Sequence, residues 1–282
     1  MTLLVIGNTA LDSFFRVARL PVEGESVLAE QGDAGPGGKG FNQAASARRA
    51  GADVRFMTML GSDAAGDRLA GWIVAEGLDG PGVLRRDGAS DQSLILVGPS
   101  GENVVVTTAA AVAALPPETV LAAAQALGPG DGLLMQGNLA PDLTAAALAA
   151  ARARGALTLL NPSPLRAGAG AAAAHADVLV MNEGEAQALD APARVRVTSL
   201  GARGARLDIG GETVFVAAPV VAARDTTGAG DALAGVFAAW MLAGRSPEAA
   251  LAAAVRAASA TVARVGAGAA LPGVGDLAAL TP

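Results

Sequence analysis

The stretch DTTGAGDALAGVFAAW (225–240) contains the residues with the clearest chemical potential. Gly228 and Gly230 lie in a loop that opens into a long apolar helix, and Asp231 falls in the first turn of that helix. Backbone N–H groups at a helix start lack intrahelical partners and carry the positive end of the helix dipole, so they favour a phosphate. Glycine lets the anion approach the backbone closely. The loop alone fits equally well an aspartate that caps a helix after a glycine turn.

A second glycine-rich stretch, GPGGKGFNQ (35–43), contains Lys39, the single lysine of the chain. Its letters match G-x-G-x-x-G. A dinucleotide-binding loop, however, follows the first strand directly and opens its helix. Here the expected first strand, 3–7, lies far upstream, and Pro36 disfavours a tight strand-to-helix turn. We therefore reject a dinucleotide-binding loop, and the P-loop pattern G-x-x-x-x-G-K-[ST] is missing from the sequence.

The composition narrows the classes of function. The 282 residues are 52% hydrophobic and carry a net charge of −6, which argues against a nucleic-acid partner. There is no cysteine and one histidine, His175, which excludes disulfides, thiolate metal sites and multi-histidine metal sites. The amino-terminal sequence MTLLVIGNTALD lacks a basic region, and the apolar runs are interrupted, so we expect no signal peptide, no membrane partner and a cytoplasmic protein.

An alternation of short apolar strands and helices is expected to position the two glycine-rich loops. Helices that alternate with such strands indicate right-handed crossovers and a parallel sheet. The expected strands of this sheet are 3–7, 54–61, 132–137, 156–161, 177–182 and 194–201, followed by a hairpin of 204–209 and 213–216. The expected helices are 40–51, 64–77, 116–127, 140–155, 167–175, 183–190, 231–244 and 246–266.

Two segments, 11–35 and 89–110, do not fit this rhythm. Within the second of them, 92–98 and 103–108 are joined by the turn PSGE and read as a β-hairpin. We therefore expect one α/β domain with a second, small β-sheet.

Two regions together carry a resemblance to a known family. GGKGFNQAASARRAGADVRFMTMLGSDAAGD (37–67) and DTTGAGDALAGVFAAWMLAG (225–244) closely resemble the two signature regions of the PfkB carbohydrate kinases, nearest to the ribokinase branch. LLMQGN, NPSP and NEGE follow in the family's order, so the resemblance covers nearly the whole chain. It implies a ribokinase-like, three-layer α/β/α fold with a mainly parallel central sheet. The nucleotide-binding core would comprise 1–10, 36–88 and 111–282, and the β-sheet lid over the substrate would comprise 11–35 and 89–110.

The resemblance also implies a role for each matching residue. Asp231 would be the base for a sugar hydroxyl, and the N–H groups of Gly228, Ala229 and Gly230 would form the anion hole. The substrate-contacting positions would be Asp12, Gly38, Lys39, Asn42 and Asn138. A compact ammonium and a planar guanidinium are not interchangeable in such a site, so we expect Lys39→Arg to impair turnover. Asp12 alone could also be an ordinary turn aspartate after a strand.

The resemblance also implies which residues would bind the nucleotide. Asn182 and Glu185 match an N-x-x-E motif that organises Mg²⁺ and phosphate, with Glu185 acting through water. Without the family, these two residues read equally as the N-cap and first-turn acid of a helix. The ATP-binding turn would add Ser199, Gly201 and Gly204. Family members often bind a potassium ion, for which Asp225 and Thr227 would supply carbonyls.

Several positions depart from the ribokinase pattern. Ala10 replaces an asparagine two positions before Asp12, and Asn138 replaces a glutamate after LLMQ. A helix that the family has between Leu189 and Arg194 is missing, and RAASATVA (256–263) lacks an asparagine often found near adenine. The first two changes alter hydrogen-bonding groups near the expected substrate, so the identity of the acceptor stays open.

The sequence favours an ATP-dependent, Mg²⁺-requiring kinase of a hydroxyl on a sugar or sugar-like compound. A nucleoside kinase of the same family is the first alternative. A sugar- or nucleotide-binding regulator without turnover is the second, and the intact Asp231 and glycine-rich loop argue against it. Pairing of two lids would give a homodimer, because lid sheets expose edge strands.

Overall fold

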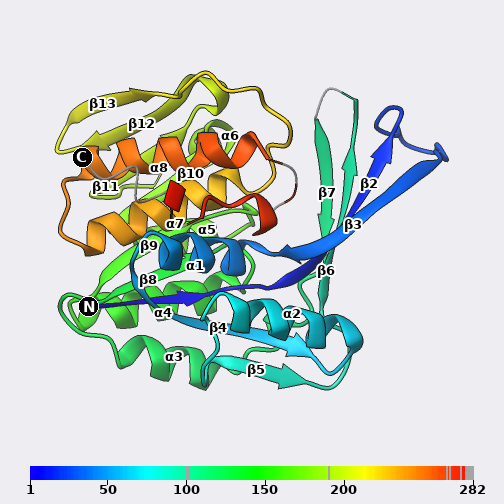
Figure 1. Cartoon of the computed structure of the whole chain (residues 1–282). Helices are drawn as coiled ribbons and strands as arrows, with labels where there is room; N and C mark the ends of the chain where they lie inside the picture. The colour runs from blue at the N-terminus through cyan, green and yellow to red at the C-terminus, as the bar shows by residue number, and fades with distance from the viewer. Residues whose placement is uncertain (100–101, 190, 265, 267, 274, 277–282) are drawn as a thin grey trace.

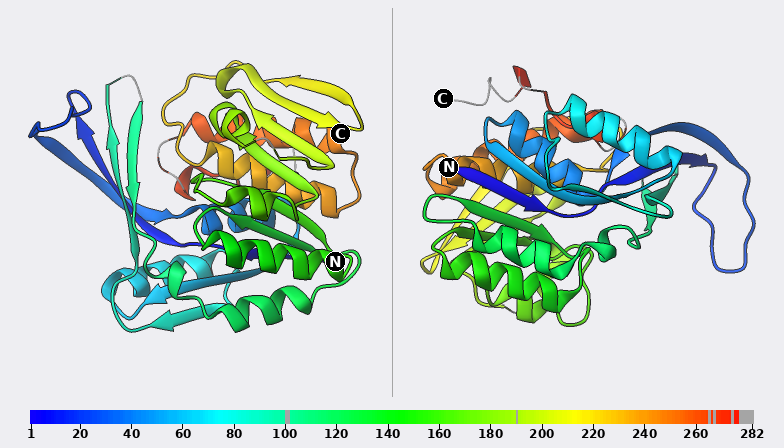
Figure 2. Two further views of the ribbon diagram at one scale, coloured as in Figure 1. Left: turned by 180° about the vertical axis from the view of Figure 1, so that it is seen from behind. Right: turned by 90° about the horizontal axis from the view of Figure 1, so that it is seen from below.

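The chain forms two β-sheets, of nine and four strands, with helices on both faces of the larger one (Figure 1). The structure is a computed structural model and describes residues 1–99, 102–189, 191–264, 266, 268–273 and 275–276. The four-stranded sheet stands beside the layered core in all views (Figures 1 and 2). Its β-rich segments are the two that depart from the helix–strand alternation of the rest of the sequence.

The nine-stranded sheet has the order β13-β12-β11-β10-β9-β8-β1-β4-β5. All of its neighbouring strands pair in parallel except at the β13–β12–β11 end, where the pairing is antiparallel. Its strands are β1 Thr2–Ile6, β4 Asp53–Gly61, β5 Val83–Arg86, β8 Gly132–Gln136, β9 Leu157–Asn161, β10 Val178–Asn182, β11 Val195–Ser199, β12 Gly204–Ile209 and β13 Glu212–Ala217.

Helices cover both faces of this sheet because its strands are apolar on both sides. In β1, Leu3 and Val5 pack into one buried cluster, and Leu4 and Ile6 pack into the other. The first cluster includes helices α1 Lys39–Arg49, α2 Ala64–Ala75, α7 Ala229–Leu242 and α8 Pro247–Val262. The second includes α3 Pro117–Gln125, α4 Pro141–Ala153, α5 Ala169–Ala173 and α6 Glu183–Ala188. Three short 3₁₀ helices complete the chain, at Val112–Ala114, Gly201–Arg203 and Gly268–Ala270.

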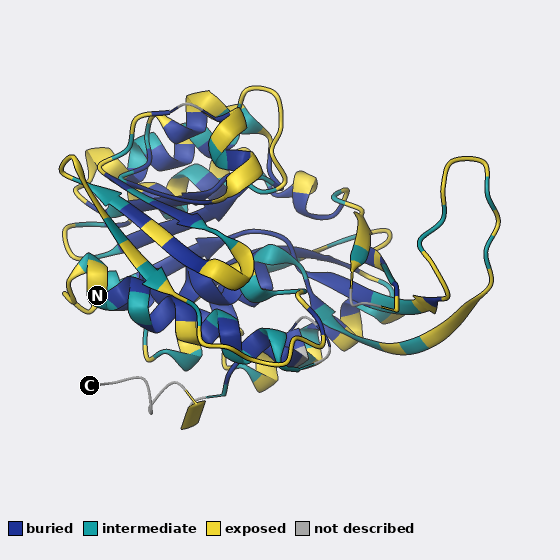
Figure 3. Ribbon diagram, turned by 90° about the horizontal axis from the view of Figure 1, so that it is seen from above, coloured by how far each residue is buried: buried dark blue, intermediate teal, exposed yellow. Residues whose placement is uncertain are grey.

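The four-stranded sheet is assembled from two separate excursions of the chain, and we call it the lid sheet. Its strands are β2 Ala10–Val17, β3 Ala29–Gly37, β6 Asp91–Val97 and β7 Asn103–Thr107, in the order β3-β2-β6-β7. Parallel pairing of β2 with β6 joins the two excursions, with Ala10 opposite Asp91. Figure 3 shows that buried residues gather in the nine-stranded sheet and its helices, whereas the segment between β2 and β3 is mostly exposed.

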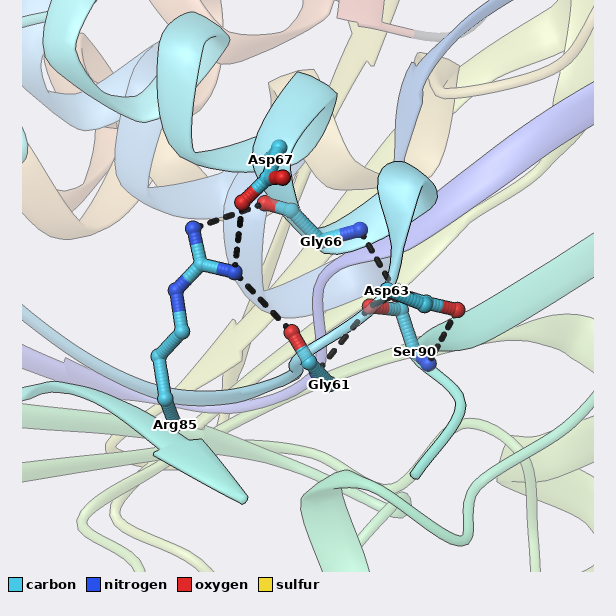
Figure 4. A network of polar contacts seen from close by, with 6 residues as sticks. All are labelled: Gly61, Asp63, Gly66, Asp67, Arg85 and Ser90. Carbon is cyan, nitrogen blue, oxygen red and sulfur yellow. Dashed lines mark hydrogen bonds and ion pairs between the residues drawn. The ribbon is translucent and has the colours of Figure 1, made fainter. Parts of the chain in front are cut away.

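A polar network fixes the point where the chain passes from the core into β6 (Figure 4). Asp63, which caps α2, accepts hydrogen bonds from the Ser90 backbone N–H (3.0 Å) and from the Ser90 hydroxyl (2.6 Å). The Ser90 hydroxyl in turn accepts from the N–H of Gly61, the last residue of β4. Arg85 donates to the Gly61 carbonyl at 3.0 Å and forms an ion pair with Asp67. The lid sheet therefore starts from an anchored position.

The predicted three-layer α/β/α arrangement with a mainly parallel sheet and a small second sheet is confirmed. The prediction missed strand β5, a short edge strand of sequence VLRR. As expected, no helix lies between α6 and β11 within residues 191–194. Residues 100–101 of the PSGE turn and the expected helix positions 190 and 265 lie outside the described residues. Across the part of the chain that the structure describes, no helix is long and apolar enough to span a membrane.

Candidate active site

The candidate site residues gather at the carboxyl ends of the parallel strands, the usual place for ligands in open α/β sheets. Asn138 follows β8, Asn182 ends β10 and Ser199 ends β11. Asn182 and Ser199 are direct neighbours in the parallel ladder. The loop before α7 and the start of α1 supply the remaining candidates.

Asp231 lies in the first turn of α7 and is 6% exposed. Its Oδ2 atom accepts a hydrogen bond from Asn42 Nδ2 (3.1 Å), and its Oδ1 atom accepts one from Gln43 Nε2 (3.0 Å). Both donors belong to α1, 188 and 189 residues away in sequence. The carboxylate is thus held by side chains of another helix, which differs from the simple helix-cap interpretation of this residue.

The loop before Asp231 ends in a glycine turn at the start of α7. Gly228 is the N-cap of α7 and adopts a left-handed conformation with φ of 81°. The N–H of Ala229 lies 3.3 Å from the Thr226 carbonyl, a long bond. Within the described residues, the N–H groups of Gly228 and Gly230 make no such contact. These free donors stand at the positive end of a helix dipole.

Asp12 is a buried carboxylate close to Asp231. It lies on β2, is 3% exposed, and its Oδ1 atom has no hydrogen-bond partner within the described part of the chain. Burial raises the pKa of Asp12 to about 7. A hydrogen bond from Ser93 opposes this rise, the negative charges of Asp231 and Asp225 add to it, and Lys39 opposes it weakly. The protein thus keeps a carboxyl group that titrates near neutrality.

The start of α1 brings the other expected substrate contacts to the same place. Gly38 is its N-cap, with φ of 89°, and a Cβ atom there would lie only 2.8 Å from Asn8 O and Ala10 N. Only glycine fits this close crossing. Lys39 and the buried Asn42 follow directly on the helix.

Three of the expected substrate residues present buried acceptor oxygens without partners among the described residues. They are Oδ1 of Asp12, Oδ1 of Asn42 and Oδ1 of Asn138. Buried polar groups are nearly always hydrogen-bonded, so these acceptors suit a ligand that donates hydrogen bonds. Ala10, whose methyl group cannot accept a bond, is fully buried beside them.

A cavity of about 810 Å³ separates the lid sheet from the core. Its walls include Phe14 and Arg16 of β2 on one side and Arg224 and Asp225 on the other. The buried Asp12 and Asp231 do not line it, and Asp225 connects the two regions. Asn103 of β7 donates a hydrogen bond to Thr227 Oγ1 (2.9 Å), so the lid sheet touches the loop before α7 directly.

The expected nucleotide residues have a structural role in the free protein. Asn182 and Glu185 form a reciprocal capping box: Asn182 Oδ1 accepts from the Glu185 N–H (2.8 Å), and Glu185 Oε2 accepts from the Asn182 N–H (2.9 Å). This is the geometry of the helix-cap alternative. One oxygen of Glu185 stays free of such bonds within the described chain. Gly201 and Gly204 flank the 3₁₀ turn after Ser199, both with positive φ.

The acidic side chains of the described residues do not form a cluster that could bind a metal ion directly. Among the described residues, no three His, Cys, Asp or Glu side chains cluster as a metal site. Asp225 Oδ1 accepts from the N–H and hydroxyl of Thr227, and Asp225 Oδ2 accepts from the Gly266 N–H at 3.0 Å. With these carboxylate oxygens engaged, Asp225 and Thr227 have mainly their backbone carbonyls to offer a cation.

Three buried amides near Asp231 were not singled out from the sequence. Gln136 Nε2 donates to Gln43 Oε1, Gln43 Nε2 donates to Asp231 and to Asn161 Oδ1, and Asn161 Nδ2 donates to the Val180 carbonyl. Each amide adjoins or lies within a motif that was noticed: GGKGFN, LLMQ and NPSP. The sequence signal that could have identified these amides is a polar residue at the end of, or within, an otherwise apolar segment.

Comparison with known proteins identifies the family. The model of the pfkB family carbohydrate kinases matches residues 2–273. The chain belongs to the PfkB family. The ribokinase of Bacillus subtilis is 30% identical to this PfkB chain over 279 residues, covering 95% of each protein. The ribokinase of Staphylococcus aureus is 29% identical over 160 residues, and in that match the chain spans only 53% of its relative's length.

Solved structures agree with the ribokinase-like fold of this PfkB protein. The Arabidopsis thaliana ribokinase complexed with ribose and ATP superposes with a TM-score of 0.85 at 25% identity, covering 99% of this chain and 97% of that one. Phosphofructokinase-2 from Escherichia coli, in complex with potassium, gives a TM-score of 0.79 at 21% identity, with the same coverage. The resemblance inferred from the two signature regions is therefore confirmed.

Proposed function

We propose that this PfkB protein transfers the γ-phosphoryl group of ATP to a hydroxyl group of a sugar or sugar-like small molecule. The observation that carries the proposal is a set of buried acceptor oxygens, on Asp12, Asn42 and Asn138, that have no partner among the described residues. Of these three residues, Asn42 contacts the carboxylate of Asp231. Sugar hydroxyls are the donors that such acceptors lack. The related Arabidopsis ribokinase, whose structure is complexed with ribose and ATP, supports this class of substrates.

Asp231 acts as the base in the proposed mechanism. As the acceptor hydroxyl oxygen attacks the γ-phosphorus, its proton moves to Asp231, the new O–P bond forms, and the bond to the ADP oxygen breaks. The N–H groups of Gly228, Ala229 and Gly230 stabilise the negative charge that develops on the phosphoryl oxygens. The lid sheet excludes water that would otherwise hydrolyse ATP.

The nucleotide lies, in this proposal, along Asn182, Glu185, Ser199, Gly201 and Gly204. The free oxygen of Glu185 suits a water-mediated contact to Mg²⁺, which keeps several waters when protein ligands are few. Mg²⁺ held there through water by Glu185 would supply positive charge against the phosphate oxygens.

A potassium ion beside the anion hole completes the proposal, held by the carbonyls of Asp225 and Thr227. It would supply fixed positive charge that orders the loop before α7. We expect turnover to rise severalfold when potassium chloride replaces lithium chloride at equal ionic strength. The measurement is ADP formation in both salts, and equal rates would remove potassium from the proposal.

The acceptor can be found by an ATP-consumption screen over pentoses, hexoses, ketoses and nucleosides, with Asp231→Ala in parallel. A sugar that stimulates ADP formation in the wild-type protein alone supports the proposed function. A nucleoside as the best acceptor would instead favour the nucleoside kinase, which Ala10 and Asn138 leave possible. Ligand binding without any turnover would favour the regulator.

The outer face of the lid sheet supports a homodimer. Cross-strand pairs Leu94–Val106 and Leu96–Val104 share this face, and Val106 is 62% exposed. The inner face of the same sheet carries Asp12. A second copy packed on this apolar face would remove it from water.

Sedimentation should show a dimer that Val106→Lys dissociates and that Val220→Lys, a change at another exposed valine, leaves intact. A monomeric wild-type protein would contradict the proposal.

A further inference from the structure

Gln43 is a fully buried residue whose amide makes three side-chain hydrogen bonds. It lies on α1, is 0% exposed, and uses both N–H bonds of its amide, one to Asp231 Oδ1 and one to Asn161 Oδ1, each at 3.0 Å. Its Oε1 atom accepts from Gln136 Nε2, also at 3.0 Å. The amide therefore connects α1 to α7, β9 and β8 at once.

These partners fix which way the Gln43 amide points. A flipped amide would turn its oxygen toward the Asp231 carboxylate and toward Asn161 Oδ1, so both contacts would become repulsive. Asn161 is itself held through its NH₂ group by the Val180 carbonyl at 2.8 Å. The donor that faces Asp231 Oδ1 is thus locked by the strands of the core.

Close packing of α1 against α7 makes the contact possible. At Gly235 on α7, one turn beyond Asp231, a Cβ atom would lie 2.4 Å from the Gln43 carbonyl oxygen and 2.8 Å from Ser46 Cβ. A larger residue at Gly235 would push the helices apart. The two helices are therefore near their closest approach where Gln43 and Asp231 meet.

We propose that Gln43 is a positioning residue that aims the Asp231 carboxylate at the acceptor hydroxyl. The proposal rests on the proposed function of Asp231 as base. Asn42 also donates to Asp231, but its free Oδ1 atom places it among the substrate contacts. Gln43 has no exposed surface and donates to Asp231, so it acts on the reaction through this carboxylate rather than by touching the substrate. A carboxylate that is free to rotate spends less time in line with the hydroxyl, and small misplacements of reacting groups are costly.

The test compares Gln43→Met, which keeps the size of the side chain and removes its hydrogen bonds, with the wild-type protein. The acceptor is the sugar with the highest ADP-forming rate, beginning with D-ribose. We expect kcat to fall about 10- to 100-fold, with the KM values for sugar and ATP within about twofold of wild type. Gln136→Met, which removes the anchor but leaves the bond to Asp231, should give a smaller fall.

Thr158→Val is the matched control. Thr158 is a buried polar residue on β9, the strand that ends at Asn161, and its hydroxyl donates to the His175 carbonyl, remote from Asp231. Its loss should lower the unfolding midpoint without changing kcat. A similar kcat for Gln43→Met and Thr158→Val would overturn the proposal, as would a change in KM alone.

A second measurement needs no substrate. If Gln43 and Asp231 are coupled, the shifts in urea unfolding midpoint of Gln43→Met and Asp231→Asn will not add in the double variant. Additive shifts would overturn the proposal. Full turnover by Asp231→Asn would instead refute the base itself. An inactive Asp231→Asn beside an unaffected Gln43→Met would refute only the positioning role.

Discussion

Replacing Asp231 with asparagine is expected to lower kcat by roughly 100- to 10,000-fold, the usual contribution of a positioned base. The substitution preserves the shape of the side chain, so the protein should stay folded. The KM values for ATP and for the sugar should change little, because Asp231 acts mainly in the transition state. Steady-state kinetics with the best acceptor of the screen provide the measurement.

Asp142→Asn is the matched control for this variant. Asp142 also lies in the first turn of a helix, α4, and is exposed, so its replacement removes the same favourable charge at a helix start. It should leave kcat unchanged. If the Asp231 variant keeps more than about a tenth of the wild-type kcat, the phosphoryl transfer does not depend on this base.

Replacing Asp12 with asparagine should have two opposite effects. The ionised carboxylate is the better acceptor for sugar hydroxyls, so we expect kcat/KM for the sugar to fall roughly 10- to 1,000-fold, mostly through KM. The free protein, however, should become more stable near neutral pH, because it no longer buries a charge without a full set of partners.

The sign of both effects follows from the pKa of Asp12, which burial raises from 3.8 to about 7. Since the folded-state pKa exceeds the unfolded one, the protonated group contributes stability that is fully present below about pH 4 and is lost as the pH rises through 7. At about pH 8 the Asp12→Asn variant should gain roughly 1–3 kcal/mol in the free energy of unfolding, and near pH 5 much less.

The same titration should appear in the kinetics of the wild-type protein. Because kcat/KM reports the free enzyme, its value for the sugar should rise as Asp12 ionises between about pH 6 and 8. Asp12→Asn should lack this rise, and Asp33→Asn, at an exposed aspartate that lines the cavity, should keep it. An unchanged pH profile in Asp12→Asn would assign the titration to another group.

The main sheet could be predicted from the sequence because each parallel strand is a short apolar run between amphipathic helices. Strand β5 escaped notice because VLRR is short and half charged, and it is a strand only because β4 pairs with it. The lid sheet was predicted as a second small sheet. The pairing of β2 with β6, which joins its two parts, does not follow from local sequence signals. Residues of β2 and β6 that pair are about 80 positions apart, as Ala10 and Asp91 are.

In the candidate site, too, some residues could be predicted from local sequence, whereas the contacts between distant segments could not. Asp231 and the loop before it could be found because glycines and an acid at a helix start have a local meaning. The contact of Asn42 and Gln43 with Asp231 joins positions 188 or more residues apart. The hydrogen bond from Asn103 to Thr227 likewise depends on how the lid sheet meets the core. Such contacts arise from packing and leave no pattern in either segment alone.

The two-part construction of the lid sheet has a consequence for the folding of the chain. Each excursion contributes one two-stranded hairpin, β2–β3 or β6–β7, and isolated hairpins of this size are marginally stable in water. In the folded chain they pair through β2 and β6, next to the parallel pair of β1 and β4 and the Asp63–Ser90 contact that holds the second crossing. We therefore expect the lid sheet to form late, on a core that is already assembled, and to open first when the protein unfolds.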